Sequence, residues 1–237
     1  MADGQNKDSS GRVFTELILL WLVTNLLIRG VLWAEGAFGL HEAILAVVPC
    51  LFIYAPVWVC SIRGVDSYDY PLWVPRLTDF GAWWRALRLA LQWFGVMLVP
   101  WLIVYHLYQT VFFGHEVGPE FPEGFFQLVA FHVFFVAIPE EFFYRGYFQT
   151  RLNEVLPKNG RIGGIPYGNS LWITSLFFAF GHSLVTFQWW HFSIFFPGLL
   201  FGLLREKTGG VLAAAFFHAL CNIGVKVLEA LYGIRVA

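Results

Sequence analysis

The chain contains seven runs of apolar residues, each close to the length of a membrane crossing, and this feature limits the fold more than any other. One helical crossing of a bilayer uses about 20 apolar residues. The runs cover residues 13–33, 41–62, 88–113, 124–148, 169–187, 191–205 and 211–233. The fifth and sixth are short and barely separated, so six to eight crossings remain open. The sequence therefore predicts an all-α fold, a polytopic transmembrane bundle of about seven helices.

Composition agrees with a protein whose environment is the lipid bilayer. Charged residues make up 13% of the chain, whereas soluble domains carry about 25%. The net charge of -1 excludes a general nucleic-acid binder, which would show a basic patch or stripe. The three cysteines do not suggest a disulfide framework, and the chain has no CxxC or HExxH pattern. We therefore expect no metal and no cofactor.

The chain has no internal repeat, which indicates one domain with three regions. Residues 1–12 are polar and are predicted to form a disordered cytoplasmic terminus. Residues 13–123 are expected to hold the N-terminal transmembrane helices, with an interfacial loop at 63–85. The first helix is too long for the apolar part of a signal peptide and lacks a small-residue cleavage site, so we expect it to be retained. Residues 124–237 form the core that carries the polar clusters described below.

Lys and Arg residues predict the orientation, because they favour the cytoplasmic side. With the N-terminus inside, all but three of the 15 lie at or near the cytoplasmic face, the exceptions being Arg29, Lys226 and Arg235. This pattern and the compact size favour a multi-pass protein of the cell inner membrane with a cytoplasmic N-terminus. The fourth run then passes from outside to inside, and Glu140 lies in the cytoplasmic half of the bilayer.

Two adjacent carboxylates, Glu140 and Glu141, interrupt the fourth run, where inserting a charge costs about 2.5–3.5 kcal/mol. On a helix, Glu141 can reach Arg145 four residues later. This pair is more readily explained as a helix-packing ion pair than as a catalytic dyad. Glu140 is rotated by about 100° from the pair, and its counter-ion cannot be read from the sequence. Pro139 is predicted to kink the helix and open room beside Glu140.

Two further polar clusters lie in apolar runs: His182 in "FFAFGHS", and His218 with Asn222 in "AFFHALCNIG". Each residue alone would be explained as a hydrogen bond between helices. A carboxylate with imidazoles from two other helices can instead hold a water. A base, a positioned water and amide or imidazole donors are the parts needed to hydrolyse a peptide bond. Ser183 and Ser193 lack a GxSxG setting, so a serine mechanism is the weaker interpretation. The role of His191 stays open.

These motifs, in this order, resemble the CPBP family, the type II CAAX prenyl endopeptidases and bacteriocin-processing membrane proteins. The resemblance spans roughly residues 125–225 and includes a glycine-rich helix before the last motif. The family patterns EExxxR, FxxxH and HxxxN are matched by "EEFFYR" (Glu140 to Arg145), "FAFGH" (Phe178 to His182) and "HALCN" (His218 to Asn222). Each motif is short, but their order makes the combined signal specific.

What the resemblance implies is a glutamate-dependent intramembrane endopeptidase that cleaves a membrane-associated protein or peptide without a metal. Its substrates are expected to be CAAX-like tails or, as in the myxosortase-like branch, C-terminal sorting signals. In that scheme the water is activated by Glu140 with His182, the oxyanion is stabilised by His218 and Asn222, and the site is supported by Glu141 and Arg145.

Two other classes of function remain as alternatives. A non-catalytic membrane scaffold or bacteriocin self-immunity protein could keep the same fold, although a scaffold has no physical reason to retain all four site residues. A proton-coupled transporter also uses buried Glu and His, but it should show repeated halves with broken helices, and none is visible in the sequence.

Overall fold

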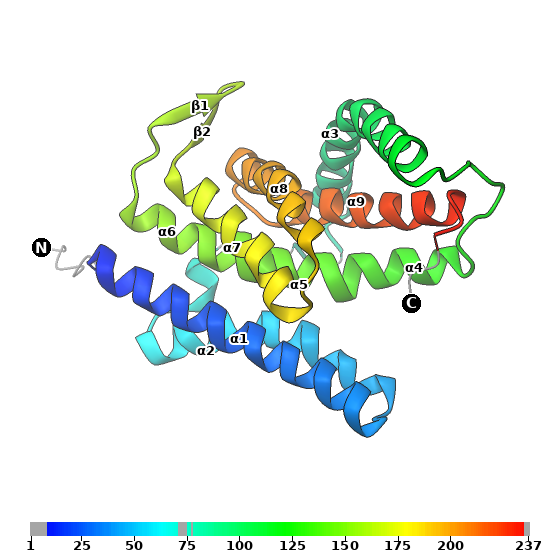
Figure 1. Cartoon of the computed structure of the whole chain (residues 1–237). Coiled ribbons are helices and arrows are strands. Elements are labelled where there is room, and N and C mark those ends of the chain that lie inside the picture. The colour runs from blue at the N-terminus through cyan, green and yellow to red at the C-terminus, as the bar shows by residue number, and fades with distance from the viewer. Residues whose placement is uncertain (1–8, 71–74, 77, 235–237) are drawn as a thin grey trace, which may run out of the picture. The chain divides into compact units, whose positions relative to one another are not determined.

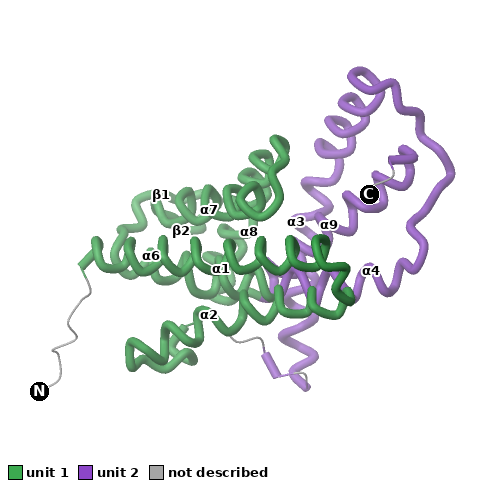
Figure 2. The backbone as a smooth tube through the Cα atoms, turned by 60° about the horizontal axis from the view of Figure 1, so that its bottom comes forward, with its two compact units in different colours: residues 1–74, 139–211 green, residues 75–138, 212–237 purple. Residues whose placement is uncertain are grey.

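The computed structural model describes residues 9–70, 75–76 and 78–234, which are mostly helical (Figure 1). The chain divides into two compact units (Figure 2). Unit 1 comprises residues 1–74 and 139–211, and unit 2 comprises residues 75–138 and 212–237. The helical architecture confirms the predicted all-α fold class.

Unit 1 holds most of the short elements as well as four helices of 14 residues or more. Its elements are α1 (Ser10–Phe38), η1 (Glu42–Ala46), α2 (Val47–Arg63), η2 (Ser67–Asp69), α5 (Ile138–Glu141, of which Ile138 belongs to unit 2), η5 (Phe142–Gln149), α6 (Thr150–Val155), β1 (Gly160–Ile162), β2 (Ile165–Tyr167), α7 (Asn169–Val185), η6 (Trp189–Ile194) and α8 (Phe195–Thr208). The strands β1 and β2 pair as an antiparallel hairpin.

The helices of unit 1 pack around the π-helical segment η5. Segment η5 contacts α2, α7 and α8, and α1 lies along α2 and α7 (Figure 1). Two glycines of α8 permit the close approach of η5. A Cβ atom on Gly202 would lie 2.4 Å from Leu171 Cδ1 and 2.8 Å from Gln149 Oε1, and one on Gly198 would lie 3.3 Å from Arg145 Nη2. Side chains of η5 therefore reach the backbone of α8.

Unit 2 contains three helical segments among the described residues. Its elements are α3 (Phe80–Leu107) continued by η3 (Tyr108–Phe112), α4 (Phe125–Phe131) continued by η4 (His132–Ala137), and α9 (Leu212–Leu231). Helix α9 packs on η4 through the small residues Ala137, Ala215 and Ala219, as helices in membranes commonly do. It packs on α3 through aromatic rings, including Phe94 against Phe217.

Among the described residues, five helices are long and apolar enough to cross a membrane. They are Ser10–Phe38, Glu42–Arg63, Phe80–Phe112, Phe125–Val155 and Leu212–Leu231. The predicted fifth and sixth crossings correspond to α7, with 17 residues, and α8, with 14 residues. These two helices are shorter than the roughly 20 residues that a crossing uses. Seven helices are present among the described residues, but only five of them qualify as candidate crossings.

Several predicted boundaries are wrong. Helix α1 begins at Ser10 because Ser9 caps it by accepting a hydrogen bond from the Arg12 backbone, so residues 10–12 are helical; residues 1–8 lie outside the described part. Helix α3 begins at Phe80, within the predicted interfacial loop, where Asp79 accepts a hydrogen bond from the backbone at Ala82. The hairpin of β1 and β2 was not predicted.

Candidate active site

The helical segment Phe125–Val155 carries both Glu140 and Glu141, and a π-helical segment lies on each side of them. The π-helical segment η4 ends just before α5, and the π-helical segment η5 begins just after Glu141. Such segments are frequent at functional sites. Pro139, which has no backbone N–H to donate, lies between the two π-helical segments.

The predicted ion pair of Glu141 and Arg145 is confirmed. Arg145 Nη1 donates to Glu141 Oε1 at 2.7 Å, and both side chains are 0% exposed. Arg145 Nη2 also donates to the backbone oxygen of Gly198 on α8 at 2.9 Å. The guanidinium carbon lies 4.4 Å from the centre of the Phe178 ring, which adds a cation–π contact. Arg145 therefore joins η5 to both α7 and α8.

Glu140 faces His182, which lies near the end of α7. His182 Nε2 lies 3.8 Å from Glu140 Oε2, and the side chains are 29% and 13% exposed. His182 Nδ1 lies 2.9 Å from the backbone oxygen of Phe178. Because a carbonyl oxygen can only accept, Nδ1 carries the hydrogen, and Nε2 of the neutral ring is left as an acceptor. The pairing of the EExxxR glutamate with the FxxxH histidine is thus present within unit 1.

Glu140 and His182 line a cavity of about 190 Å³. Its walls are largely apolar and include Ile28 from α1 and Phe52 from α2. The N-terminal helices therefore complete a cavity whose ionisable groups come from residues 140–191. No sequence motif marked Ile28 or Phe52, because each is one apolar residue within an apolar helix.

A hydrogen-bonded group from α1 forms part of the cavity wall. The Asn25 side chain donates to the Trp21 backbone oxygen at 2.8 Å, and Trp21 Nε1 donates to the Phe177 backbone oxygen at 2.9 Å. Gly181 permits the close packing of α1 here, because a Cβ atom would lie 3.0 Å from Asn25 Oδ1. These contacts fix α1 against α7 at the level of the cavity.

His191, whose role the sequence left open, also lines this cavity. It lies on η6, and its ring centre is 5.9 Å from that of His182 with the two planes at 70°. Its Nδ1 is buried and has no hydrogen-bond partner among the described residues. The sequence left its role open, because no motif includes this residue and it was expected to lie close to the outer surface.

His218 and Asn222 lie on α9 in unit 2. His218 is buried and Asn222 is half-buried. Their spacing of four residues within one continuous α-helix places them on the same face, as predicted. In the same unit, His132 of η4 lies within electrostatic range of His218 and Lys226. The oxyanion role of His218 and Asn222 stays a prediction.

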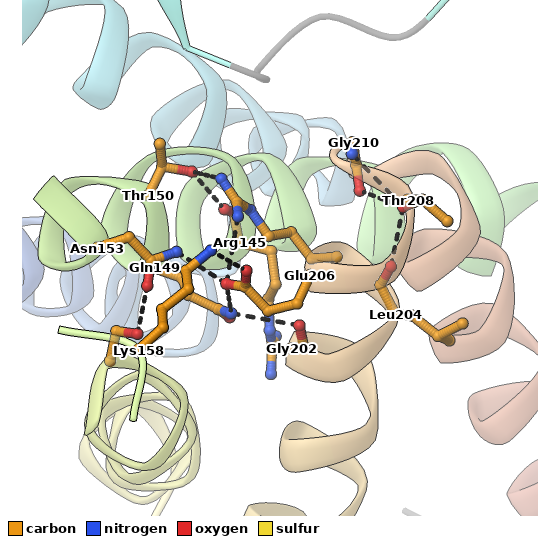
Figure 3. A network of polar contacts seen from close by, with 12 residues as sticks. Arg145, Gln149, Thr150, Asn153, Lys158, Gly202, Leu204, Glu206, Thr208 and Gly210 are labelled. Carbon is orange, nitrogen blue, oxygen red and sulfur yellow. Dashed lines mark hydrogen bonds and ion pairs between the residues drawn. The ribbon is translucent and has the colours of Figure 1, made fainter. Parts of the chain in front are cut away.

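A second polar cluster in unit 1 surrounds Glu206 near the end of α8 (Figure 3). Its side chain is 1% exposed, and its oxygens accept from four side chains. The donors are Gln149 Nε2 at 2.7 Å, Asn153 Nδ2 at 2.7 Å, Lys158 Nζ at 2.5 Å and Arg205 Nη1 at 3.2 Å. Burial alone would raise the pKa of Glu206, but the hydrogen bond from Lys158 and the charge of Arg205 outweigh it and lower the pKa.

No group of three or more His, Cys, Asp or Glu side chains within the described ranges is arranged to hold a metal ion. The expectation that the site uses no metal stays a prediction.

Comparison with known proteins identifies the segment that contains these motifs. Residues 122–224 match the model of the family described as type II CAAX prenyl endopeptidase Rce1-like. This segment, which is less than half of the chain, is thus similar to Rce1-like domains. It includes all six residues that the sequence motifs singled out, whereas the Asn25 and Phe52 walls of the cavity lie outside it. The match does not distinguish branches of the family, and the myxosortase-like branch stays a prediction.

The Rce1-like domain indicates CAAX-type intramembrane protease activity on a protein or peptide substrate. The five candidate crossings agree with a multi-pass membrane protein. No curated protein and no solved structure matched the chain.

Proposed function

We propose that this protein is an intramembrane endopeptidase in which Glu140 and His182 hold and activate the water that attacks a peptide bond. The observation that carries the proposal is the separation of 3.8 Å between Glu140 Oε2 and His182 Nε2 at a cavity of about 190 Å³. The Rce1-like domain supplies independent support, because its family indicates proteolysis.

The two facing atoms suit a water better than a direct hydrogen bond. An ionised carboxylate only accepts, and His182 Nε2 also accepts because Nδ1 donates to Phe178. At 3.8 Å the two atoms are too far apart for a hydrogen bond, and a water between polar groups is the usual bridge beyond about 3.5 Å. One water can donate one hydrogen to each acceptor. Its lone pairs then face the cavity and a substrate carbonyl carbon.

The chemical step is general base catalysis. Glu140 takes a proton from the water while the water oxygen forms a bond to the carbonyl carbon, and the carbonyl oxygen becomes an oxyanion. The C–N bond then breaks, the nitrogen gains a proton, and the products are a carboxylic acid and an amine. A positioned general base contributes about 10²- to 10⁴-fold in rate.

The surroundings assign this role to Glu140 and not to its neighbour. Glu141 is held by Arg145 at 2.7 Å and is fully buried, whereas Glu140 lines the cavity. A base must reach the proton that it removes, so a carboxylate at the cavity wall is the better candidate. Glu141 and Arg145 support the site by fixing η5 to α8.

The proposal also includes an oxyanion role for His218 and Asn222, which rests on the HxxxN motif and not on a measured geometry. Donors aimed at a developing oxyanion are worth about 10²- to 10³-fold in turnover. His218→Ala and Asn222→Ala are therefore expected to lower turnover while leaving substrate binding nearly intact. Loss of binding without loss of turnover would contradict this role.

We also propose a substrate class and a location. The apolar cavity wall favours an apolar side chain next to the scissile bond, as CAAX-like tails and C-terminal sorting signals provide.

The positive-inside pattern favours the cell inner membrane with a cytoplasmic N-terminus. A reporter fused after residue 237 should be active outside the cytoplasm. A signal found only in the cytoplasm would reject this topology.

Mapping of new protein termini tests the function and requires no assumption about the substrate. Membrane fractions are compared from cells that express the wild-type protein, Glu140→Gln, His182→Gln or Glu154→Gln. Glu154 is the matched control, because it is a carboxylate of unit 1 that is 40% exposed and lies outside the cavity. We expect a set of new termini with the wild type and Glu154→Gln that is absent with the other two. If no terminus depended on Glu140, the scaffold alternative would replace the protease.

A further inference from the structure

His191 lies in the proposed active site although no sequence motif includes it. It lines the cavity together with Glu140 and His182, and its ring is centred 5.9 Å from the His182 ring. It comes from η6, whereas Glu140 comes from α5 and His182 from α7. Three separate elements of unit 1 thus each direct one ionisable side chain to one cavity.

The hydrogen-bonding state of His182 leaves one task in the reaction unassigned. Nδ1 of His182 donates to the Phe178 backbone, and its Nε2 accepts from the proposed water. His182 therefore holds no proton that it can give to the substrate. Glu140 gains a proton from the water, and the leaving nitrogen must gain a proton before it departs.

His191 has a ring nitrogen for this task. Its Nδ1 is buried and has no hydrogen-bond partner among the described residues. Leaving a buried polar atom without a partner costs free energy, so such an atom at a cavity is explained when a ligand meets it. Burial and the neighbouring His182 lower the pKa of His191, so its protonated ring is a stronger acid than an ordinary imidazolium and gives its proton readily to a leaving amine.

We propose, on the basis of the function proposed above, that His191 is the general acid of the reaction and donates a proton to the departing amine. Protonated His191 transfers one proton to the nitrogen of the tetrahedral intermediate, the C–N bond breaks, and the electron pair of that bond stays on nitrogen. The carbonyl reforms as a carboxylic acid and His191 becomes neutral. The proton that Glu140 took from water then returns to His191, so no further reactant is needed.

The test compares two leaving groups in one peptide. The peptide bond found by terminal mapping is synthesised as an amide and as a thioester, and both are supplied in liposomes with purified protein. An amine must be protonated to leave, whereas a thiol has a pKa of about 8.5 and leaves as the thiolate. His191→Gln should therefore slow amide cleavage by about 10²- to 10⁴-fold and thioester cleavage by less than about tenfold.

Two other variants and a stability measurement make the result decisive. His182→Gln should slow both reactions to a similar extent, because it disturbs the water that both require. His41→Gln, which changes an exposed histidine of unit 1 outside the cavity, should leave both reactions unchanged. Melting temperatures show whether His191→Gln is folded, and His191→Asn provides a second variant if it is not.

Equal slowing of the two reactions in a folded His191 variant, or slowing of neither, would overturn the general-acid role and leave the proposed protease intact. Failure of the proposed function would give a different experimental result. In that case the wild-type protein cleaves neither compound, or Glu140→Gln cleaves the thioester as fast as the wild type. Either result would also reject the general-acid role of His191.

Discussion

Two glutamates of unit 1, Glu206 and Glu140, occupy opposite kinds of environment. Glu206 is 1% exposed, and four side chains donate to its two oxygens (Figure 3). Glu140 faces His182 Nε2 at 3.8 Å, at the wall of a cavity. Dense donors stabilise a carboxylate but occupy its lone pairs. A base needs lone pairs that a water can reach, so the first environment suits structure and the second suits chemistry.

The Glu206 cluster also shows what positions the cavity. Gln149 donates both to Glu206 and to the backbone oxygen of Gly202, and Arg145 donates to the backbone oxygen of Gly198. Two residues of η5 thus hold two glycines of α8, with a spacing of four on each element. The structural cluster and Arg145 together fix η5, which directly follows Glu140 and Glu141. Substitutions around Glu206 should therefore lower stability, whereas substitution of Glu140 should lower turnover.

The largest loss of stability is expected for Glu141→Gln. The change leaves the charge of Arg145 buried without its carboxylate, and breaking such a pair costs about 3–5 kcal/mol. The melting temperature in detergent should fall by several degrees, and activity should fall with it. Glu154→Gln is the control, because Arg151 keeps its contact with Glu16. A Glu141→Gln protein that melts with the wild type would show that the pair does not hold η5.

A smaller loss is expected for Glu206→Gln. A neutral amide weakens the hydrogen bonds from Lys158 and Arg205, and hydrogen bonds to charged groups contribute about 1.5–3 kcal/mol. Turnover per folded molecule should remain close to that of the wild type, because the cavity keeps Glu140 and His182. If turnover were lost while the melting temperature stayed constant, the assignment of Glu206 to structure would be wrong.

The glycine contact between η5 and α8 can be tested by Gly202→Ala. The added Cβ atom would meet Gln149 Oε1 of η5 at 2.8 Å as well as Leu171 Cδ1 of α7 at 2.4 Å, and overpacking of this kind costs about 1–3 kcal/mol. About 1 kcal/mol is regained, because alanine favours a helix over glycine. Gly210→Ala is the matched control, since its Cβ atom would have no neighbour within 4 Å. Equal melting temperatures for the two variants would refute the close approach.

The smallest expected effect is the loss in acid of the stability that Glu206 contributes. The pKa of Glu206 in the folded protein lies below its ordinary value of 4.5, so the cluster stabilises the protein fully above that pH. This stabilisation should be lost as the pH falls through the folded pKa. The difference in melting temperature between the wild type and Glu206→Gln should therefore be constant from about pH 5 to 8 and shrink below about pH 4.5. A difference in melting temperature that grows in acid would show that folding raises the pKa of Glu206 and does not lower it.

The sequence predicted those parts of the site that depend on one helix. Glu141 and Arg145 are four residues apart, so their ion pair follows from helical geometry alone, and the apolar runs gave the fold class. The contact between Gln149 and Glu206 could not be found in this way, because the two residues are 57 positions apart and meet only through the packing of η5 on α8. The same reason hid His191, Asn25 and the apolar walls of the cavity.

Helix lengths were predicted less well, because caps and not hydropathy set the ends. Helix α1 extends to Phe38, and Gly39 follows it with a φ of 59°, a conformation that glycine adopts without strain. Hydropathy had ended this helix at residue 33. Helices α7 and α8 are shorter than the runs suggested, since the element between them is a short 3-10 helix rich in aromatic residues. Apolar composition alone did not separate a crossing from a short buried helix.

The turnover of purified Glu140→Gln, measured together with its melting temperature, shows whether Glu140 activates the water while Glu141 holds the helix. The substrate is the mapped amide peptide in liposomes, and Glu154→Gln is assayed in parallel. We expect a protein that has the melting temperature of the wild type, binds the peptide and cleaves it more slowly by about 10²- to 10⁴-fold. Turnover close to that of the wild type in folded Glu140→Gln would contradict this expectation.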